Sequence, residues 1–187
     1  MLYQFLKDMW DILRLRFHAP EHYRYTLPAA AAVVLLLGVI NAASMSPLFG
    51  REPAAIAFAV LLTAVKWLVL ARAMRAVASY YGGGAKLPLW GYTLASEALA
   101  VPMLLLLYAP QLSALGMFWQ VWTFFAQATG FMRIGNISAG KVLLGYFLYL
   151  VGTLAVGTVL LMLFITAGWF DADVLNRQMQ EIMQSSK

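Results

Sequence analysis

The sequence predicts an all-α membrane protein, a polytopic bundle of five transmembrane helices with a short amphipathic helix at each end. Of its 187 residues, 63% are hydrophobic and only 11% are charged, whereas about a quarter of the residues of a soluble domain are charged. The mean hydropathy is +0.76. Apolar stretches of about 20 residues can cross the hydrocarbon layer, and several follow one another between residues 27 and 168.

Composition also excludes several classes of site. The chain has no cysteine, which excludes disulfides, thiolate metal sites, haem attachment and a cysteine nucleophile. The net charge of +5 comes from basic residues scattered between hydrophobic blocks. Such a distribution indicates membrane orientation rather than nucleic-acid binding. We therefore expect the lipid bilayer as a partner, and no nucleic acid.

An amphipathic helix is predicted over residues 2–18, within an N-terminal segment of residues 1–25. At about 100° per residue, one face is apolar and the other polar. The apolar face holds Leu2, Phe5, Leu6, Met9, Trp10, Ile12, Leu13 and Phe17; the polar face holds Gln4, Lys7, Asp8, Asp11, Arg14 and His18. Its tryptophan and arginines suit a helix in the headgroup plane on the cytosolic side. The alternative is packing on a neighbouring cytosolic surface. His18-Ala19-Pro20 should end it.

The five expected spans lie within residues 26–170. They cover residues 27–43, 54–72, 89–108, 112–132 and 142–168, with a turn over residues 46–53 and a break at Pro110. The first span is read as a retained helix, because the segment before it is too long and too mixed for a signal peptide. After the fifth span, residues 171–187 should form a short amphipathic helix outside the membrane, capped by Asp171 or Asp173.

The connections predict the orientation of the bundle. Nine Lys and Arg residues lie in the N-terminal segment and in the connections before spans three and five, against three on the other side. Basic residues in short loops favour the cytoplasm. We therefore expect a multi-pass protein of the inner (cytoplasmic) membrane, with its N-terminus in the cytoplasm and its C-terminus outside.

Two glycine-containing connections are expected to be cytosolic hinges. The first hinge, residues 80–88, contains Gly82, Gly83, Gly84 and Lys86; the second hinge, residues 133–141, contains Gly135, Asn136, Gly140 and Lys141. The second nearly matches a phosphate-binding G-x-x-x-x-G-K-[ST] loop, but Val142 lacks the hydroxyl and the loop joins two membrane spans. No nucleotide is expected. Asn136-Ile137-Ser138 matches a glycosylation acceptor, which the cytosolic location argues against.

Glu97 is the sharpest functional candidate. It lies about ten residues into the third span, so a rise of about 1.5 Å per residue puts it about 15 Å deep. An ionisable residue at that depth is a functional hypothesis with a partner to be found, and Lys66 in the second span is the candidate. The functional reading is a proton or cation site. The structural reading, which we favour here, is a buried pair with Lys66 or a protonated carboxyl bonded to a neighbour.

The remaining polar candidates are predicted to join helices. Gln120 and Gln127 lie seven residues apart and share one face of the fourth span, and Asn41 lies near the outer end of the first. His18 and His22 have no acidic or cysteine co-ligands in the pattern, so we expect interfacial residues and no metal site. No catalytic constellation appears at one membrane depth, and no cofactor is expected.

The two hinges also echo each other in sequence. Gly84-Ala85-Lys86 precedes Gly91-Tyr92, and Ala139-Gly140-Lys141 precedes Gly145-Tyr146. With Pro102, Trp122 and the five-span layout, the chain resembles the Ypt/Rab-interacting protein (Yip) family over residues 20–168. The resemblance implies a five-helix bundle with a cytosolic N-terminus and, in eukaryotic members, traffic roles with small GTPases. The short N-terminal segment departs from the eukaryotic pattern and resembles the bacterial type.

These patterns predict a bacterial, non-enzymatic Yip-like protein that acts as an adaptor, accessory subunit or membrane-organising protein. A protein partner or a second copy would bind through helix packing. The alternative is a small transporter or ion-pathway component that uses Glu97 and Lys66. An enzyme acting on lipids is a third reading, disfavoured because the chain shows no acid–base or metal set.

Overall fold

The computed structural model describes residues 2–50, 52–82, 87–103 and 110–171, and beyond them Val174, Arg177, Gln178, Gln180 and Gln184. Every regular element in these residues is a helix, and none is a strand, so the all-α prediction is confirmed. Most of the expected C-terminal helix lies outside the described residues, although the five named residues within it are helical, and the hinge residues Gly83, Gly84 and Lys86 lie outside as well.

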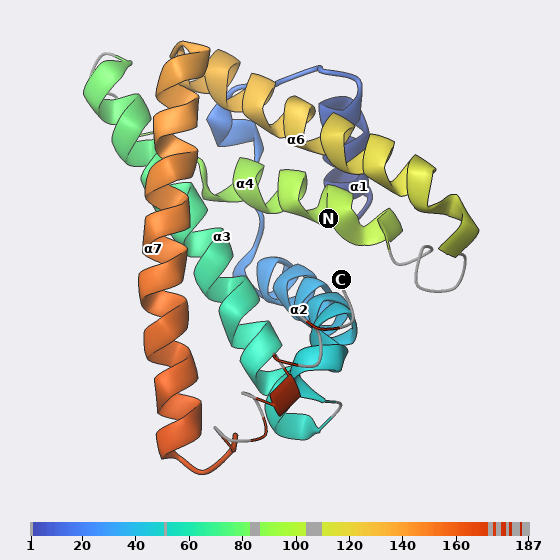
Figure 1. The fold of residues 1–187 in the computed structure, drawn as a ribbon. Helices are drawn as coiled ribbons and strands as arrows, with labels where there is room; N and C mark the ends of the chain where they lie inside the picture. Colours follow the sequence, from blue (N-terminus) through green and yellow to red (C-terminus); the bar gives the residue numbers. More distant parts are fainter. Residues whose placement is uncertain are drawn as a thin grey trace.

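Within the described part of the chain, three helices are long and apolar enough to cross a membrane: α2 (Leu27–Phe49), α3 (Pro53–Tyr81) and α7 (Ala139–Thr166). The central helix, α3, packs along both α2 and α7 (Figure 1). Large apolar side chains of α7 point away from the protein: Leu143, Phe147, Leu150, Val151, Leu154, Val159, Met162 and Leu163 are all about half exposed or more. Such a face suits contact with lipid, which supports a membrane location.

Small residues allow these three helices to approach closely. Gly38 of α2 faces the backbone of Val60 on α3, where a Cβ would lie 2.6 Å from the Val60 Cα. Gly145 of α7 faces the sulfur of Met74 on α3, and a Cβ there would lie 2.5 Å from it. In a lipid bilayer the hydrophobic effect does not drive helices together, so membrane helices associate through the close van der Waals packing that such small residues allow. Gly145 therefore allows α7 to pack closely against α3.

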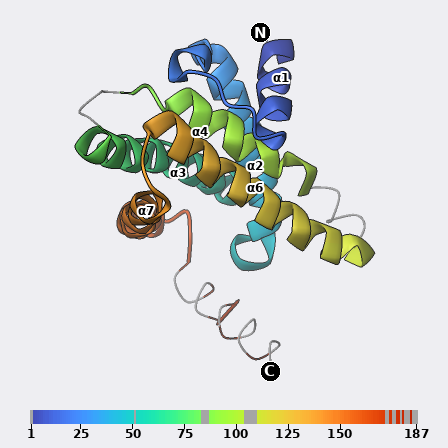
Figure 2. The ribbon, with the colours of Figure 1, turned by 90° about the horizontal axis from the view of Figure 1, so that it is seen from above.

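A second layer crosses this one. It consists of α1 (Leu2–Leu13), α4 (Trp90–Glu97) and α6 (Ser113–Gly135). Figure 2 looks along α7 and shows α4 and α6 lengthwise and side by side, so they run across α7 rather than parallel to it. Helix α1 packs on both α4 and α6. Short 3₁₀ helices, η1 (Pro20–His22), η2 (Ala98–Met103) and η3 (Pro110–Leu112), connect the elements.

The structure divides the expected third span. Helix α4 ends at Glu97, and the chain continues as the 3₁₀ helix η2, which contains Pro102. Proline lacks the N–H that an α-helix would bond at this point. Residues 104–109 lie outside the described residues. Helix α6 has 23 residues and contains Gln120 and Gln127, and it is not among the helices that are apolar enough to be candidate spans. The third and fourth spans therefore stay a prediction.

Several expected boundaries were wrong. The N-terminal helix ends at Leu13 instead of His18, and Leu15 adopts a positive φ of 59°. Helix α2 continues to Phe49, through the first half of the turn expected at residues 46–53. Helix α6 continues to Gly135, and Asn136 ends it in the left-handed conformation with φ 47°. A residue with positive φ follows the ends of the N-terminal helix and of α6, and an asparagine in this conformation is a common helix terminator.

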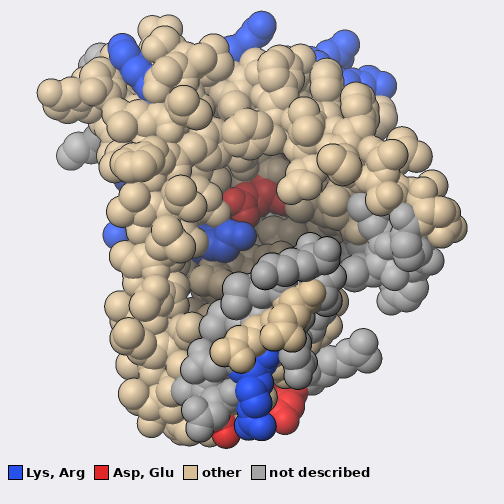
Figure 3. Space-filling model, viewed as in Figure 1, with Lys and Arg blue, Asp and Glu red and all other residues tan. Residues whose placement is uncertain are grey.

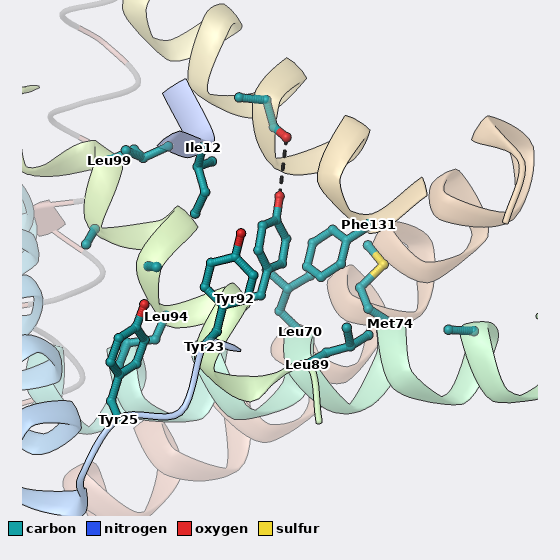
Figure 4. Packing of buried hydrophobic residues seen from close by; sticks show 14 of the residues in the cluster. Ile12, Tyr23, Tyr25, Leu70, Met74, Leu89, Tyr92, Leu94, Leu99 and Phe131 are labelled. Carbon is teal, nitrogen blue, oxygen red and sulfur yellow. Dashed lines mark hydrogen bonds between the residues drawn. The ribbon is translucent and has the colours of Figure 1, made fainter. Parts of the chain in front are cut away.

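An aromatic cluster joins the crossing layer to the loop before α2 (Figure 4). The ring of Tyr92 on α4 is fully buried and lies edge-on to Tyr23 and to Phe131, with centroids 5.3 and 5.1 Å away. The Tyr92 hydroxyl donates to the carbonyl oxygen of Gln127 on α6 at 3.0 Å. This contact fixes α4 against α6, and α4 carries Glu97 at its end.

Candidate functional site

A polar pocket of about 230 Å³ lies between α4, η2 and α6. Its lining residues are Ser96, Glu97, Ala100, Gln120, Thr123, Phe124 and Gln127. Glu97 supplies a carboxylate, and four other side chains supply a hydroxyl (Ser96, Thr123) or an amide (Gln120, Gln127). Figure 3 shows acidic atoms deep in a hollow of the surface, with basic atoms close beside them. We call this hollow the Glu97 pocket.

Glu97 is held in this pocket by the end of α4. It is the last residue of the helix and is partly exposed, whereas the six residues before it are buried. Lys66 on α3 lies near enough to act on the carboxylate electrostatically. The two side chains do not come within the 4.0 Å of an ion pair. The predicted partner therefore lies close to Glu97 but does not form an ion pair with it, and Lys66 is not among the residues that line the pocket.

A chain of hydrogen bonds runs behind Glu97 and joins three helices. The Tyr146 hydroxyl on α7 donates to Oε1 of Gln127 at 2.8 Å, and Nε2 of Gln127 donates to Oγ of Ser96 at 2.9 Å. The Ser96 hydroxyl donates in turn to the carbonyl oxygen of Thr93 at 2.9 Å. Each donor has an acceptor, so the chain is a fixed wall of the pocket rather than a set of free ligands.

The packing of α4 on α6 positions this wall. Gly130 on α6 lies directly under the Tyr92 hydroxyl, and a Cβ at Gly130 would overlap it. Gly91 lies equally close to the carbonyl oxygen of Tyr23. Trp119 Nε1 also donates to the carbonyl oxygen of Leu99 on η2 at 2.8 Å. These contacts hold the Ser96–Glu97 end of α4 opposite Gln127.

The predicted polar residues fall into two places. Glu97, Gln120 and Gln127 line one pocket, with Lys66 beside it. Asn41 lies elsewhere: its Nδ2 donates to Thr63 Oγ1 at 2.8 Å and joins α2 to α3. Sequence reasoning did not include Tyr146 among the site residues. The feature that could have pointed to Tyr146 is its hydroxyl group, which lies in the largely apolar segment predicted as the fifth span.

The two hinges meet at one end of the molecule. Gly82 at the end of α3 faces the carbonyl oxygen of Gly135 at the end of α6, and a Cβ at Gly82 would lie 2.5 Å from it. The Lys141 ammonium lies 4.8 Å from the centre of the Tyr81 ring, a cation–π distance. Gly140 has open space around it. In Figure 3, basic side chains lie along the upper edge, where Figure 1 places the start of α7, part of α6 and the loop after α1.

A second polar cluster lies at the N-terminal helix, and it corrects one expectation. Asp8, predicted on the exposed polar face, is fully buried. It accepts from Tyr25 Oη at 2.7 Å and from Gln4 Nε2 at 2.9 Å, and His22 Nε2 lies 3.1 Å away. Burial and this hydrogen bond raise the pKa of Tyr25 well above its usual range. The helix thus turns part of its polar face inward.

As a result, only part of the apolar face of that helix is buried, and the rest is exposed. Phe5 and Ile12 are buried, while Leu2, Leu6 and Trp10 are more than half exposed. The imidazole rings of His18 and His22 lie 4.4 Å apart, and His18 Nε2 lies 3.3 Å from Asp11 Oδ2. Among the described residues, no three His, Asp or Glu side chains are placed to hold a metal ion.

The Glu97 pocket contains one carboxylate and neutral hydrogen-bonding groups. It can bind a cation, an amine or an amide, and a single carboxylate suits binding better than paired acid–base chemistry. No protein-family model matches the chain, and searches of curated proteins and of solved structures likewise give no match.

Proposed function

We propose that this chain is a non-enzymatic protein of the bacterial inner membrane, of the Yip-like class, that serves as an adaptor or accessory subunit. In this proposal the Glu97 pocket receives a basic or amide side chain from a membrane helix of the partner. One observation carries the proposal: a polar pocket opens on an apolar, exposed face. A charge near hydrocarbon is costly unless it is paired, so a partner group that fills the pocket would be strongly favoured.

The surface beside the pocket supports a helix as the partner. Helix α6 exposes large apolar side chains next to the pocket: Leu115, Met117, Phe118, Val121, Phe124 and Phe125 are each half exposed or more. Phe124 lines the pocket as well. A partner helix on this face would bury apolar area and place one polar side chain opposite Glu97. Polar side chains join membrane helices in this way.

The proposal includes a topology. Five spans would place both hinges in the cytoplasm and the C-terminus outside. Two observations support the placement of both hinges on the same side of the membrane. Gly82 contacts Gly135, and basic side chains lie along that edge of the molecule. The positive-inside rule then assigns that side to the cytoplasm.

Photo-crosslinking in native membranes tests the adaptor proposal. A crosslinking residue at Thr123, in the pocket, should capture one discrete protein, and Glu97→Gln should abolish the capture without lowering the thermal stability of the purified chain. The same residue at Val159, on the lipid-facing side of α7, is the matched control and should capture none. Capture that persists in Glu97→Gln would contradict the role of the carboxylate.

A small transporter or ion-pathway component is the second candidate. The separation of Glu97 from Lys66 favours it, because a carboxylate that is not locked in an ion pair can exchange a proton or cation. Reconstitution into liposomes distinguishes the two proposals. Flux of protons or monovalent cations that disappears in Glu97→Gln would support this candidate, and equal flux in both proteins would remove it.

A further inference from the structure

One face of α3 changes from apolar to basic towards the hinge end of the helix. Ala64, Trp67, Leu68, Ala71, Arg72 and Arg75 follow one another at intervals of three, one, three, one and three residues, and therefore share this face. The first four are apolar and the last two are arginines. From Ala64 to Arg75 the helix rises about 16 Å, close to half of the roughly 30 Å hydrocarbon layer.

Two neighbouring pockets follow this face. The first is an apolar groove of about 550 Å³ between α2 and α3, whose wall includes Ala30, Ala31, Val34, Ala64, Trp67 and Leu68. The second holds about 120 Å³ and is lined by Arg72 and Arg75 with the chain before α4. Leu68 and Trp90 line both, so groove and basic pocket are continuous.

The basic pocket lacks an internal counter-ion. No carboxylate lines either pocket, and among the described residues neither Arg72 nor Arg75 forms an ion pair. Both side chains are exposed. Guanidinium groups bind phosphate through two parallel hydrogen bonds, which makes a phosphate oxygen the complementary ligand.

A tryptophan pair marks where groove and pocket join. Trp67 Nε1 donates to the carbonyl oxygen of Trp90 at 2.9 Å, and the two rings lie 6.4 Å apart. Tryptophans prefer the boundary between hydrocarbon and headgroups. This places the apolar groove on the hydrocarbon side and the two arginines at the headgroups, the order that a phospholipid requires.

We propose that this groove binds one anionic phospholipid. An acyl chain of this lipid lies between α2 and α3. Its phosphate contacts Arg72 and Arg75 in the membrane leaflet on the side of the two hinges. The site is separate from the Glu97 pocket and shares no lining residue with it.

Lipid-dependent stability of the purified full chain tests the proposal. In detergent micelles, phosphatidylglycerol should raise the thermal midpoint by several degrees more than phosphatidylcholine does. The double variant Arg72→Gln/Arg75→Gln should lose this difference. Arg133→Gln, which removes an exposed arginine from α6, is the matched control and should keep it.

A second pair of measurements distinguishes the binding of a lipid from the binding of a free anion. Native mass spectrometry should retain one phosphatidylglycerol on the wild type, and Ala31→Trp, which fills the groove, should reduce retention at least tenfold. Inorganic phosphate should give no comparable stabilisation. Equal retention in the double arginine variant or in Ala31→Trp would overturn the proposal, and so would equal stabilisation by inorganic phosphate.

Discussion

Gln127 on α6 donates a hydrogen bond to the Ser96 hydroxyl on α4, with Nε2 2.9 Å from Oγ. The opposite atom of the same amide, Oε1, accepts from Tyr146 on α7 at 2.8 Å. One side chain therefore joins three helices, and it does so at the residue that precedes Glu97. The position of the carboxylate depends on this amide rather than on a contact of its own with Lys66.

Replacing Gln127 by alanine should destabilise the protein by about 1–2 kcal/mol, since hydrogen bonds between membrane helices contribute about 1 kcal/mol each. Gln120→Ala removes an amide from the same pocket, but an exposed one, and should change stability by less than about 0.5 kcal/mol. Reversible unfolding in mixed micelles measures both. Equal effects of the two substitutions on stability would show that the hydrogen bonds of Gln127 make no specific contribution to the stability of the protein.

Gly130→Ala should also destabilise, by about 1–3 kcal/mol, because a methyl group there overlaps the Tyr92 hydroxyl in a closely packed interior. Gly140→Ala, on the same end of the molecule, meets open space and should be neutral or stabilise α7 by about 0.5–1 kcal/mol. Adding Tyr92→Phe to Gly130→Ala removes the overlapping oxygen. The double variant should therefore lose less stability than the two single changes added together.

Asp8→Ala should cost about 1–3 kcal/mol, because the buried hydroxyl of Tyr25 would lose its acceptor. Asp11→Ala removes a nearby carboxylate whose partner, His18, is exposed, and should cost less than about 1 kcal/mol. Tyr25→Phe is the informative third variant. It should cost less than Asp8→Ala, because Asp8 keeps Gln4 and His22 as neighbours. A larger effect of Asp11→Ala would contradict the assignment of Asp8 as the anchor.

The composition of the sequence was enough to predict the all-α fold and a membrane location. It predicted α2, α3 and α7 well because long apolar stretches leave few alternatives to a spanning helix. It did not predict that the helix within residues 89–108 ends at Glu97 and continues as the 3₁₀ helix η2, and whether this segment crosses the membrane stays a prediction. Helix α4 is held by Tyr92, Tyr23 and Gly130, which are far apart in sequence, and no local pattern encodes their contact.

The candidate site could be predicted only in part from the sequence, because the sequence shows which polar residues are unusual but not which of them meet. Glu97, Gln120 and Gln127 stood out because polar residues are rare in apolar stretches. Their meeting in one pocket depends on the crossing of α4 and α6, which helical periodicity within one segment does not give. Asp8 was misplaced because an aspartate is normally exposed unless paired, and its partners Tyr25 and His22 come from a loop beyond the helix.

The proposed five spans make one clear prediction at Gln111, just before α6. If α4 with η2 and α6 each cross the membrane, Gln111 lies outside the cell, opposite to the hinges. The chain has no cysteine, so single cysteines can be placed without background. In whole cells an impermeant maleimide should label Gln111→Cys but leave Tyr80→Cys, exposed beside the first hinge, unlabelled until the membrane is opened. Labelling of Gln111→Cys only after opening would place α4 and α6 on the cytosolic side of three spans. The Glu97 pocket would then face the interface instead of the hydrocarbon, and its partner would be a cytosolic surface.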